Sequence, residues 1–398
     1  MSVFAVDPLL AGEVGLEVLA VVLFKVLVVF VLLIVSVMLM IWAERKIISD
    51  MQNRIGPTRA GPWGILQTLA DGLKLIFKED LIPDNANRTV FKLAPLLTLV
   101  PAFLTFSIIP LGGDFTDKDG VISLFGNDTY LQLADPPIGL LLFLAMSSVA
   151  VYGIMLAGWS SGSKYPLLGS VRATSQMISY EAALGLTVAA VFLQSGSFST
   201  HTIVSEQSVW QWNMWFTGFV PMAIFMIAAT AELNRPPFDL VEAEQELVGG
   251  FHTEYSSIRF ALFYLAEFMN TITISAIVVT IFLGGPNGPI FIDAVAWLWP
   301  ILWFTVKLFA LLFTFIWMRA TLPRFRYDQL MDLGWKVLTP VALGWLLFLG
   351  ARDVANDRGW NPVLVVGVAV TAFAVFGALL LRAVRMGKQV RELEEMRG

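Results

Sequence analysis

Apolar residues recur in long runs along the whole chain, and short polar stretches separate them. A run of about twenty apolar residues is long enough to cross the hydrocarbon core of a bilayer as a helix. The pattern therefore predicts an all-α fold, a polytopic integral membrane protein with about nine transmembrane helices. The expected spans are 18–42, 93–111, 138–158, 176–193, 215–231, 259–283, 296–318, 337–350 and 362–381. The eighth is short and contains Pro340, so its bounds are the least defined by the pattern.

A stretch after the first span has a different periodicity. Between Trp63 and Lys78 the apolar residues follow helical spacing on one face: Trp63, Leu66, Leu69, Leu73, Ile76 and Phe77. Polar residues occupy the opposite face: Gln67, Asp71, Lys74 and Lys78. The stretch is too short and too polar to span, so we expect an amphipathic helix along the cytoplasmic interface. It either anchors its loop or forms one wall of an opening for a lipid-soluble molecule.

Composition agrees with this class. The chain is 57% hydrophobic and 14% charged, with a mean hydropathy of +0.73, which is far more apolar than a soluble domain of this length. We expect one membrane domain over 1–398 and no soluble domain. Within it we distinguish a first cytoplasmic loop at 43–92, an acidic cytoplasmic loop at 231–259, and an extra C-terminal helix with a charged tail at 362–398.

The positive charges indicate an orientation. Most of the 26 lysines and arginines lie in the C-terminal tail and in the loops after the first, third, fifth and seventh spans. Loops rich in Lys and Arg stay on the cytoplasmic side of a membrane. The N-terminus is therefore expected outside and the C-terminus in the cytoplasm, and no secretory signal peptide is expected.

Residue types that are rare or missing exclude several kinds of site. The chain has no cysteine, so it cannot hold an iron–sulfur cluster through thiolates or form a disulfide. His201 and His252 both fall in loops, which makes a haem held by two histidines improbable. No metal site is expected. The stretch 158–165 has the wrong spacing for a phosphate loop, so we expect no nucleotide there and no nucleic-acid partner.

The stretch 231–255, AELNRPPFDLVEAEQELVGGFHTEY, has an unusual charge pattern for a segment between two apolar spans. It carries six acids: Glu232, Asp239, Glu242, Glu244, Glu246 and Glu254. Pro236 and Pro237 should end the incoming helix, and Asp239, Glu242 and Glu246 would then share one face of a new one. Crowded carboxylates could couple protonation to another event. The alternative is a solvated acidic loop with no role beyond solubility.

Four ionisable residues fall inside the predicted spans: Lys25, Glu181, Glu267 and Lys307. Such residues usually face the bundle interior or a wet path, because a charge in the bilayer is costly. Glu181 and Glu267 lie towards the cytoplasmic side and could extend the acidic loop into a proton route. We expect Lys25 to extend to the outer interface and Lys307 to pair with a partner that the sequence does not identify.

Three long motifs resemble one membrane subunit of respiratory complex I. They are AERKIISDMQNRIGPTRAGPWGILQTLADGLKLIFKED at 43–80, GWSSGSKYPLLGSVRATSQMISYE at 158–181, and the acidic stretch followed by FALFYLAEF at 260–268. In order and spacing they are similar to the H subunit of NADH–quinone oxidoreductase, the counterpart of mitochondrial NADH dehydrogenase subunit one. The likeness extends to about Arg326. Leu233 replaces a residue that is often polar in the family, and His252 replaces one that is commonly Asn.

The resemblance implies a function. Members of the family join the peripheral redox arm of complex I to its membrane arm, and the quinone enters between the first span, the amphipathic helix and the sixth span. The residues that would line or shape the quinone chamber are Arg45, Arg54, Asp71 and, near the acidic loop, Phe251. The acids that would carry the protonation signal are Glu181, Glu232, Asp239, Glu242, Glu244, Glu246, Glu254 and Glu267. No complete catalytic site is expected in this chain, which would act as part of a proton-translocating enzyme.

The resemblance also implies partners. Quinone would be the substrate, while NADH, FMN and the iron–sulfur clusters would belong to other subunits. Those partners would be the peripheral-arm quinone-site and iron–sulfur subunits and the small and antiporter-like membrane subunits, within the inner membrane of a bacterial cell. Two alternatives stay open: the membrane subunit of an energy-converting hydrogenase, and a stand-alone secondary transporter, which would require inverted repeats that the sequence does not display.

Overall fold

The protein is a bundle of long helices. The computed structural model describes residues 7–10, 15–113, 115, 119–240, 247–292 and 295–361, and isolated positions between 367 and 386. The α-helices are α1 (Leu16–Met51), α2 (Gln67–Phe77), α3 (Arg88–Phe106), α4 (Gly139–Ser160), α5 (Lys164–Ser195), α6 (Thr200–Glu206), α7 (Asn213–Phe216), α8 (Phe219–Glu232), α10 (Ser257–Phe282), α11 (Leu298–Thr321), α12 (Tyr327–Asp332) and α13 (Thr339–Asp357). The described strands are β1 (Val121–Leu124) and β2 (Asn127–Tyr130), which pair antiparallel.

The predicted all-α membrane class is confirmed. Within the described residues, seven helices are long and apolar enough to cross a bilayer: α1, α3, α4, α5, α10, α11 and the continuous helix Tyr327–Asp357. Helix α8 is a shorter apolar helix at the position of the predicted fifth span. Most of the predicted ninth span, 362–381, and of the tail after it lies outside the described residues.

Several helices are longer than the apolar runs that predicted them. Helix α1 continues to Met51, α5 begins at Lys164, and the eighth span covers Tyr327–Asp357 rather than 337–350. Hydropathy detects only the part of a helix that matches the hydrocarbon core, whereas polar residues extend these helices beyond it. Pro340 does not end the eighth span, because it is in the first turn of α13, directly after a π-helical turn at Leu333–Leu338.

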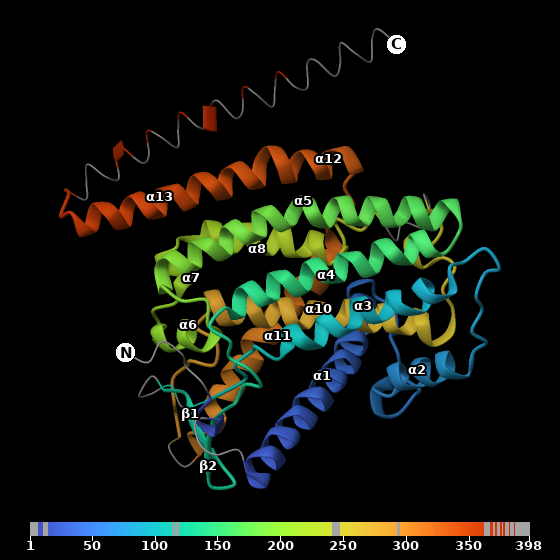
Figure 1. The fold of residues 1–398 in the computed structure, drawn as a ribbon, viewed down its shortest axis with the longest axis horizontal. Helices are drawn as coiled ribbons and strands as arrows, with labels where there is room; N and C mark the ends of the chain where they lie inside the picture. The colour runs from blue at the N-terminus through green and yellow to red at the C-terminus, as the bar shows by residue number, and fades with distance from the viewer. Residues whose placement is uncertain are drawn as a thin grey trace.

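Helix α10 is at the centre of the bundle. Of the residues in its apolar stretch, 83% are buried. The helix contacts α1, α2, α3, α8 and α11. Helix α3 packs on α10, α4 on α3 and α5 on α4, and the α12–α13 helix packs on the outer side of α5 (Figure 1). Helix α1 crosses the bundle obliquely and exposes most of its apolar surface, as expected for a helix in contact with lipid (Figure 1).

The bundle has two distinct ends. At one end, which we call the hairpin end, are the β1–β2 pair and a short 3₁₀ helix, Pro8–Leu10, that contacts β2 (Figure 1). At the other, the loop end, α1 and α8 finish and α10 begins. Exposed tryptophans lie near both ends, among them Trp210 and Trp297 near the hairpin end and Trp63 and Trp159 near the loop end. Tryptophan is enriched at both interfaces of a membrane, so these side chains fit a bundle that spans it.

The two lysines inside the spans have buried partners. Lys25 does not extend to the outer interface as we expected from the sequence. It is 8% exposed, its Nζ lies 2.9 Å from Asp7 Oδ2, and it also donates to Thr129 Oγ1 of β2. Lys307 Nζ donates to three backbone carbonyls just after α10, at distances of 2.7–2.9 Å. Leu283 caps the end of α10, and the other two carbonyls, of Gly285 and Asn287, belong to the loop after it. Each lysine therefore joins segments at the hairpin end.

Proline within α3 creates a link to the segment before α10. Pro95 has no N–H, so the carbonyl of Phe91 loses its helical donor. The hydroxyl of Tyr255 donates to that carbonyl at 3.2 Å, and the two rings stack with centroids 3.9 Å apart. Burial raises the pKa of Tyr255 to about 12, so the phenol remains a neutral donor. Through this contact the end of the acidic loop is held against α3.

Candidate functional site

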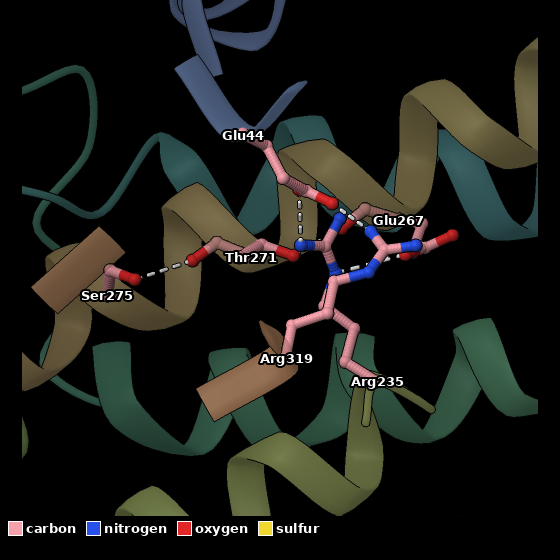
Figure 2. A network of polar contacts seen from close by, with 6 residues as sticks. All are labelled: Glu44, Arg235, Glu267, Thr271, Ser275 and Arg319. Atoms are coloured by element: carbon pink, nitrogen blue, oxygen red, sulfur yellow. Dashed lines mark hydrogen bonds and ion pairs between the residues drawn. The ribbon is translucent and has the colours of Figure 1, made fainter. Parts of the chain in front are cut away.

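Four charged side chains form a network at the loop end of the bundle (Figure 2). Arg235, just after α8, donates from Nη1 to Glu44 Oε2 of α1 at 3.1 Å and from Nε to Glu267 Oε1 of α10 at 3.0 Å. Arg319, near the end of α11, donates to the other oxygen of Glu44. Glu44 and Arg235 are 5% and 3% exposed. The network therefore joins segments that are distant in sequence.

Charge balance explains why the centre of this network, Glu44 and Arg235, can be buried. Two guanidinium groups face two carboxylates, so no formal charge is left uncompensated. Hydrogen bonds between ionised groups are about twice as strong as neutral ones. The guanidinium of Arg235 also lies over the ring of Phe268, 4.4 Å from its centroid. Removing Arg235 would leave the carboxylates of Glu44 and Glu267 without the cation that they share, which is costly.

Hydroxyl groups continue from this network along α10. Thr271 Oγ1 donates to the carbonyl of Glu267 at 2.9 Å, and Ser275 Oγ donates to the carbonyl of Thr271 at 2.8 Å (Figure 2). Threonine and serine in helices commonly bond in this way to the carbonyl four residues earlier. These two hydroxyls are thereby satisfied within α10.

Two further predicted acids meet on α4. Ser147 donates to Glu232, the last residue of α8, and Ser148 donates to Glu181 of α5. Glu232 is 8% exposed. Because the two serines are adjacent in the sequence, the structure brings Glu232 and Glu181 to neighbouring positions beside the same helix. Hydroxyl donors stabilise the ionised form of a carboxylate and thereby oppose the effect of burial.

The other predicted acids have different surroundings. Asp239 is buried and lies 2.9 Å from Arg324 Nη2, just beyond α11. It is not in a helix, so it does not begin the helical face that we predicted. Glu254 is half-buried in the turn before α10. Glu242, Glu244 and Glu246 lie outside the described residues, and their predicted arrangement stays a prediction.

A large cavity of about 1270 Å³ lies between α1, α2 and the start of α10. Charged side chains line part of it, and these are Glu44, Arg45, Arg54, Asp71, Lys74 and Arg319. Aliphatic side chains line the rest, including Ile34, Val37, Met38, Leu69, Leu73 and Leu262. Residues 34–38 of α1 are farther from the loop end than residues 44–54, so the wall changes from charged to apolar along α1. Such a cavity suits a molecule with a polar head and an apolar body.

Helix α2 forms one wall of this large cavity. It begins at Gln67 rather than at Trp63, since Trp63 is in a 3₁₀ turn with a positive φ of 53°. Arg45 of α1 pairs with Asp71, and Gln67 Nε2 donates to the other Asp71 oxygen at 3.0 Å. At the end of α2, Ser257 donates to the carbonyls of Leu75 and Lys78. These bonds fix α2 against α1 and α10.

A second, small cavity of about 70 Å³ lies between α3, α4, α8 and α10. Both Glu232 and Glu267 line it, as does Phe251. Phe251, which we expected beside the quinone, is therefore not among the residues of the large cavity. Tyr264 lines both cavities. Since Glu44 lines the large cavity and Glu267 the small one, their shared partner Arg235 connects the two walls.

His252 is the titratable group that the sequence places beside the acids. It is half-buried among aromatic rings, with the ring centroids of Phe251 and Phe260 at 4.9 and 5.3 Å. Desolvation lowers the pKa of His252 to about 4, so its imidazole is neutral at pH 7. It therefore adds no positive charge to the wall of the small cavity. Among the residues described, we find no group of three or more histidine and acidic side chains that could hold a metal ion.

Sequence reasoning did not identify several members of the site. Glu44 and Arg319 are 275 positions apart, and only the crossing of α1 and α11 brings them together. A signal was present, because each is a charged residue within the terminal turns of an apolar helix. Ser147 and Ser148 gave no signal, since serine is common in membrane helices and its partner depends on the packing.

The fold and site together define a class of protein, a polytopic helical membrane protein with a large amphiphilic cavity beside a buried network of acids. A family model described as NADH dehydrogenase matches residues 24–350. The chain is 51% identical over 338 residues to the H subunit of NADH–quinone oxidoreductase from Streptomyces avermitilis, covering 83% of this chain and 72% of the relative. It is 48% identical over 403 residues to the subunit from Frankia alni, covering 98% and 85% of the two chains.

A third relative, the H subunit from Frankia casuarinae, is 50% identical over 386 residues, which cover 94% of this chain and 82% of the relative. The chain therefore belongs to the NADH dehydrogenase family, and these relatives within it are H subunits of NADH–quinone oxidoreductases.

Proposed function

We propose that this chain is the membrane subunit that forms the quinone chamber of a proton-pumping NADH–quinone oxidoreductase and couples quinone reduction to proton translocation. The observation that carries the proposal is the position of Arg235. It bonds to Glu44 in the wall of the large cavity and to Glu267 in the wall of the small one. A change of charge in the large cavity can therefore act on a buried carboxylate through a single side chain.

The shape and chemistry of the large cavity support quinone as its occupant. A quinone has a polar ring and a long apolar tail, which match the charged and aliphatic parts of the wall. The volume of the large cavity, about 1270 Å³, exceeds the roughly 300–1,000 Å³ of ordinary ligand pockets. Leu69 and Leu73 of α2 line the cavity and are 46% and 48% exposed, so lipid can approach the cavity along that side. On this proposal, Arg45, Arg54 and Asp71 shape the charged part of the chamber.

The acids then have a role in coupling. Reduction of a quinone to its quinol requires two protons, and the developing negative charge repels nearby carboxylates. Glu44 and Glu267 respond through Arg235, and Glu232 and Glu181 extend the path along α4. Neighbouring carboxylates titrate as a coupled set, so protonation of one changes the proton affinity of the next. The remaining acids of the loop would connect these coupled carboxylates to the loop end, and they are Asp239, Glu242, Glu244, Glu246 and Glu254.

The chain carries only part of the enzyme. With no cysteine it offers no thiolate for an iron–sulfur cluster, so electrons would arrive on peripheral-arm subunits that also bind NADH and FMN. We propose that the loop end faces the cytoplasm and those subunits. The small and antiporter-like membrane subunits would receive the signal in the inner membrane of a bacterial cell.

A photoreactive quinone with a long tail tests the proposal in the assembled complex. Cross-linking followed by peptide mapping should place the label on residues 34–56 of α1 and its loop, 68–76 of α2 and 258–268 of α10, which surround the large cavity. Excess natural quinone should prevent the labelling. Labelling confined to other surfaces of the chain, or undiminished by excess quinone, would show that the cavity is not the chamber.

A further inference from the structure

A pocket of about 210 Å³, which we call the hairpin pocket, lies at the hairpin end of the bundle. It is formed by the end of α5, the start of α6 and the loop before α4. Because α5 ends at Ser195 and α4 begins at Gly139, the pocket lies at the level where two membrane-spanning helices end. The polar headgroups of lipids lie at this level of a bilayer. Among the residues of its wall are Asp135, Phe192, Phe198 and Ser199.

Asp135 contributes a carboxylate to the hairpin pocket, and its partners there are neutral. Its two oxygens accept from the hydroxyl of Ser199 at 2.9 and 2.7 Å, and Oδ1 also accepts from the N–H of His201 at 3.5 Å, which stabilises the ionised form. No lysine or arginine pairs with Asp135 in the part of the chain that the structure describes. Burial raises the pKa of Asp135 and lowers the pKa of His201, so the imidazole is neutral at pH 7 and does not balance the carboxylate. A partly buried charge without a counter-charge is costly, so the pocket favours a cationic occupant.

Two aromatic rings form an apolar part of the same wall. Phe192, in the last turn of α5, and Phe198, in the loop after it, stack with their ring centroids 4.0 Å apart. The N–H of Leu140 donates to the carbonyl of Phe198 at 3.0 Å, which fixes this loop against the start of α4. The face of an aromatic ring attracts an ammonium group. A carboxylate beside such rings therefore suits a small alkylammonium group.

Apolar side chains beside the hairpin pocket can contact the acyl chains of a lipid. Ile138 and Leu141 at the start of α4, and Leu193 in the last turn of α5, are exposed. Helices α4 and α5 pack against each other, so these positions belong to adjacent helix ends. A lipid whose headgroup enters the pocket therefore finds apolar contacts for its chains on the same two helices.

We propose that the hairpin pocket binds the headgroup of a membrane lipid that carries a primary ammonium group, as phosphatidylethanolamine does. The ammonium group donates to Asp135, the methylene groups of the headgroup contact the rings of Phe192 and Phe198, and the acyl chains extend along α4 and α5. Charge selects this occupant, because Asp135 repels an anionic headgroup and a trimethylammonium headgroup has no N–H to donate. The site depends on neither quinone nor proton movement, so its failure would leave the proposed function unaffected.

Photolabelling of the purified wild-type complex tests the site directly. The complex is reconstituted into bilayers that contain a trace of phosphatidylethanolamine with a diazirine in one acyl chain. Peptide mapping should place the label at the start of α4 and in the last turns of α5. Excess unlabelled phosphatidylethanolamine should remove this label, whereas the same excess of phosphatidylcholine should not. Equal competition by both lipids, or label confined to other surfaces of the chain, would overturn the proposal.

Asp135→Asn tests the carboxylate itself. The variant removes the charge and keeps an oxygen that can accept from Ser199 and His201. Labelling of the pocket should fall about tenfold, as expected for the loss of one hydrogen bond to a charged group. The matched control is Asp128→Asn, which removes an exposed carboxylate of β2 at the same end of the bundle but outside the pocket. The control should label like the wild type, and equal labelling of Asp135→Asn and the wild type would overturn the proposal.

Thermal stability provides a readout that does not depend on labelling. A lipid that binds only the folded complex raises its Tm. The Tm of the wild type should therefore be higher in bilayers that contain phosphatidylethanolamine than in phosphatidylcholine alone. This difference should shrink in Asp135→Asn and persist in Asp128→Asn. The same difference in both variants would contradict recognition by Asp135.

Electron cryo-microscopy of the wild-type complex in the mixed bilayers identifies the occupant. We expect headgroup density within hydrogen-bond distance of the Asp135 carboxylate and acyl-chain density along α4 and α5. A metal ion bound to Asp135, or a lysine or arginine of a partner subunit inside the hairpin pocket, would overturn the proposal. Competition in the wild type and this density decide the site even if Asp135→Asn lowers the amount of assembled complex.

Discussion

Arg235 is the residue that connects the two cavities, because it bonds carboxylates from two different helices while being almost completely buried. In the sequence Arg235 lies within the acidic stretch 231–255, and nothing there indicates that it is inside the bundle. Burial of this kind depends on tertiary packing, which places Glu44 of α1 and Glu267 of α10 on either side of the guanidinium. The intramembrane acids Glu181 and Glu267 could be predicted, since a charge in an apolar run is conspicuous.

Replacing Arg235 by Met should strongly destabilise the protein. It leaves Glu44 and Glu267 buried without their shared partner, and breaking a buried ion pair in this way costs about 3–5 kcal/mol. That is a large fraction of a typical folding free energy, so we expect much less assembled complex in membranes. Quantitative immunoblots and the Tm of the purified complex measure the effect.

Lys336→Met is the matched control for Arg235→Met. Lys336 pairs with Asp332 in an exposed i,i+4 arrangement, and such pairs contribute about 0–1 kcal/mol. The amount of complex should stay near the wild-type level. Similar losses in both variants would contradict a special role for the buried network.

His252 should make the stability of the wild-type protein depend on pH. Its pKa is about 4 in the folded protein and 6.5 in the unfolded chain, so the unfolded chain binds more protons between these values. The stability that results is complete above pH 6.5 and is lost as the pH falls towards 4, by at most about 1.4 kcal/mol per pH unit. The Tm measured from pH 7.5 to 4.5 should show this fall.

In His252→Phe the ring cannot titrate, so this part of the pH dependence should disappear while the aromatic contacts are retained. The remaining dependence on pH then comes from the carboxylates. Equal slopes of Tm against pH in the variant and the wild type would show that His252 is solvated in the folded protein.

At the scale of elements, the sequence predicted the existence of the spans better than their ends. The apolar runs located every described span, because twenty apolar residues have few alternatives to a membrane helix. The length of the eighth span was wrong, since Pro340 is accommodated by the π-helical turn before it. The start of α2 was also wrong, because Trp63 fits the apolar periodicity although its backbone has a positive φ. Periodicity reports side-chain position and not backbone conformation.

Gly72 offers a test of the wall that α2 contributes to the large cavity. It lines that cavity, and a Cβ added there meets no heavy atom within 4 Å. Gly72→Leu should therefore fill part of the cavity without a clash, and it should favour the helix by up to about 1 kcal/mol. We expect a severalfold higher KM for long-tailed quinones and a smaller change for short-tailed ones.

Gly72→Ala is the control for this cavity-filling variant, because it favours the helix in the same way but adds a single carbon. It should leave both KM values close to those of the wild type. If Gly72→Leu raised the KM of short-tailed and long-tailed quinones equally, the cavity would not be the path of the tail.

At the scale of the whole molecule, the distribution of charge predicts which end of the bundle faces the cytoplasm. The chain has no cysteine, so single cysteines can be introduced without background. Ser163 at the loop end and Ser123 on the hairpin are suitable, because Ser→Cys hardly changes the volume. A membrane-impermeant maleimide should label Ser163→Cys only from the cytoplasmic side and Ser123→Cys only from outside. The reverse pattern would invert the proposed orientation.

Most of the site depends on how the helices of the whole molecule pack against one another. The network forms where α1, α10, α11 and the segment after α8 converge, and the two cavities lie on either side of it. No local pattern specifies how helices so distant in sequence cross. The long motifs shared with the family indicated the site through resemblance rather than through geometry. The position of Phe251 illustrates the difference, since it is close to the acids as expected but in the wall of the small cavity.

The central claim is that a buried carboxylate changes its protonation when quinone is reduced. Redox-triggered infrared difference spectroscopy of the assembled complex measures this directly through the carboxyl C=O stretch, which only a protonated acid shows. We predict that quinone reduction changes such a band, that the band shifts in heavy water, and that Glu267→Gln or Glu232→Gln removes part of it. Spectra with the same carboxyl bands in the wild type and in both variants would contradict the account.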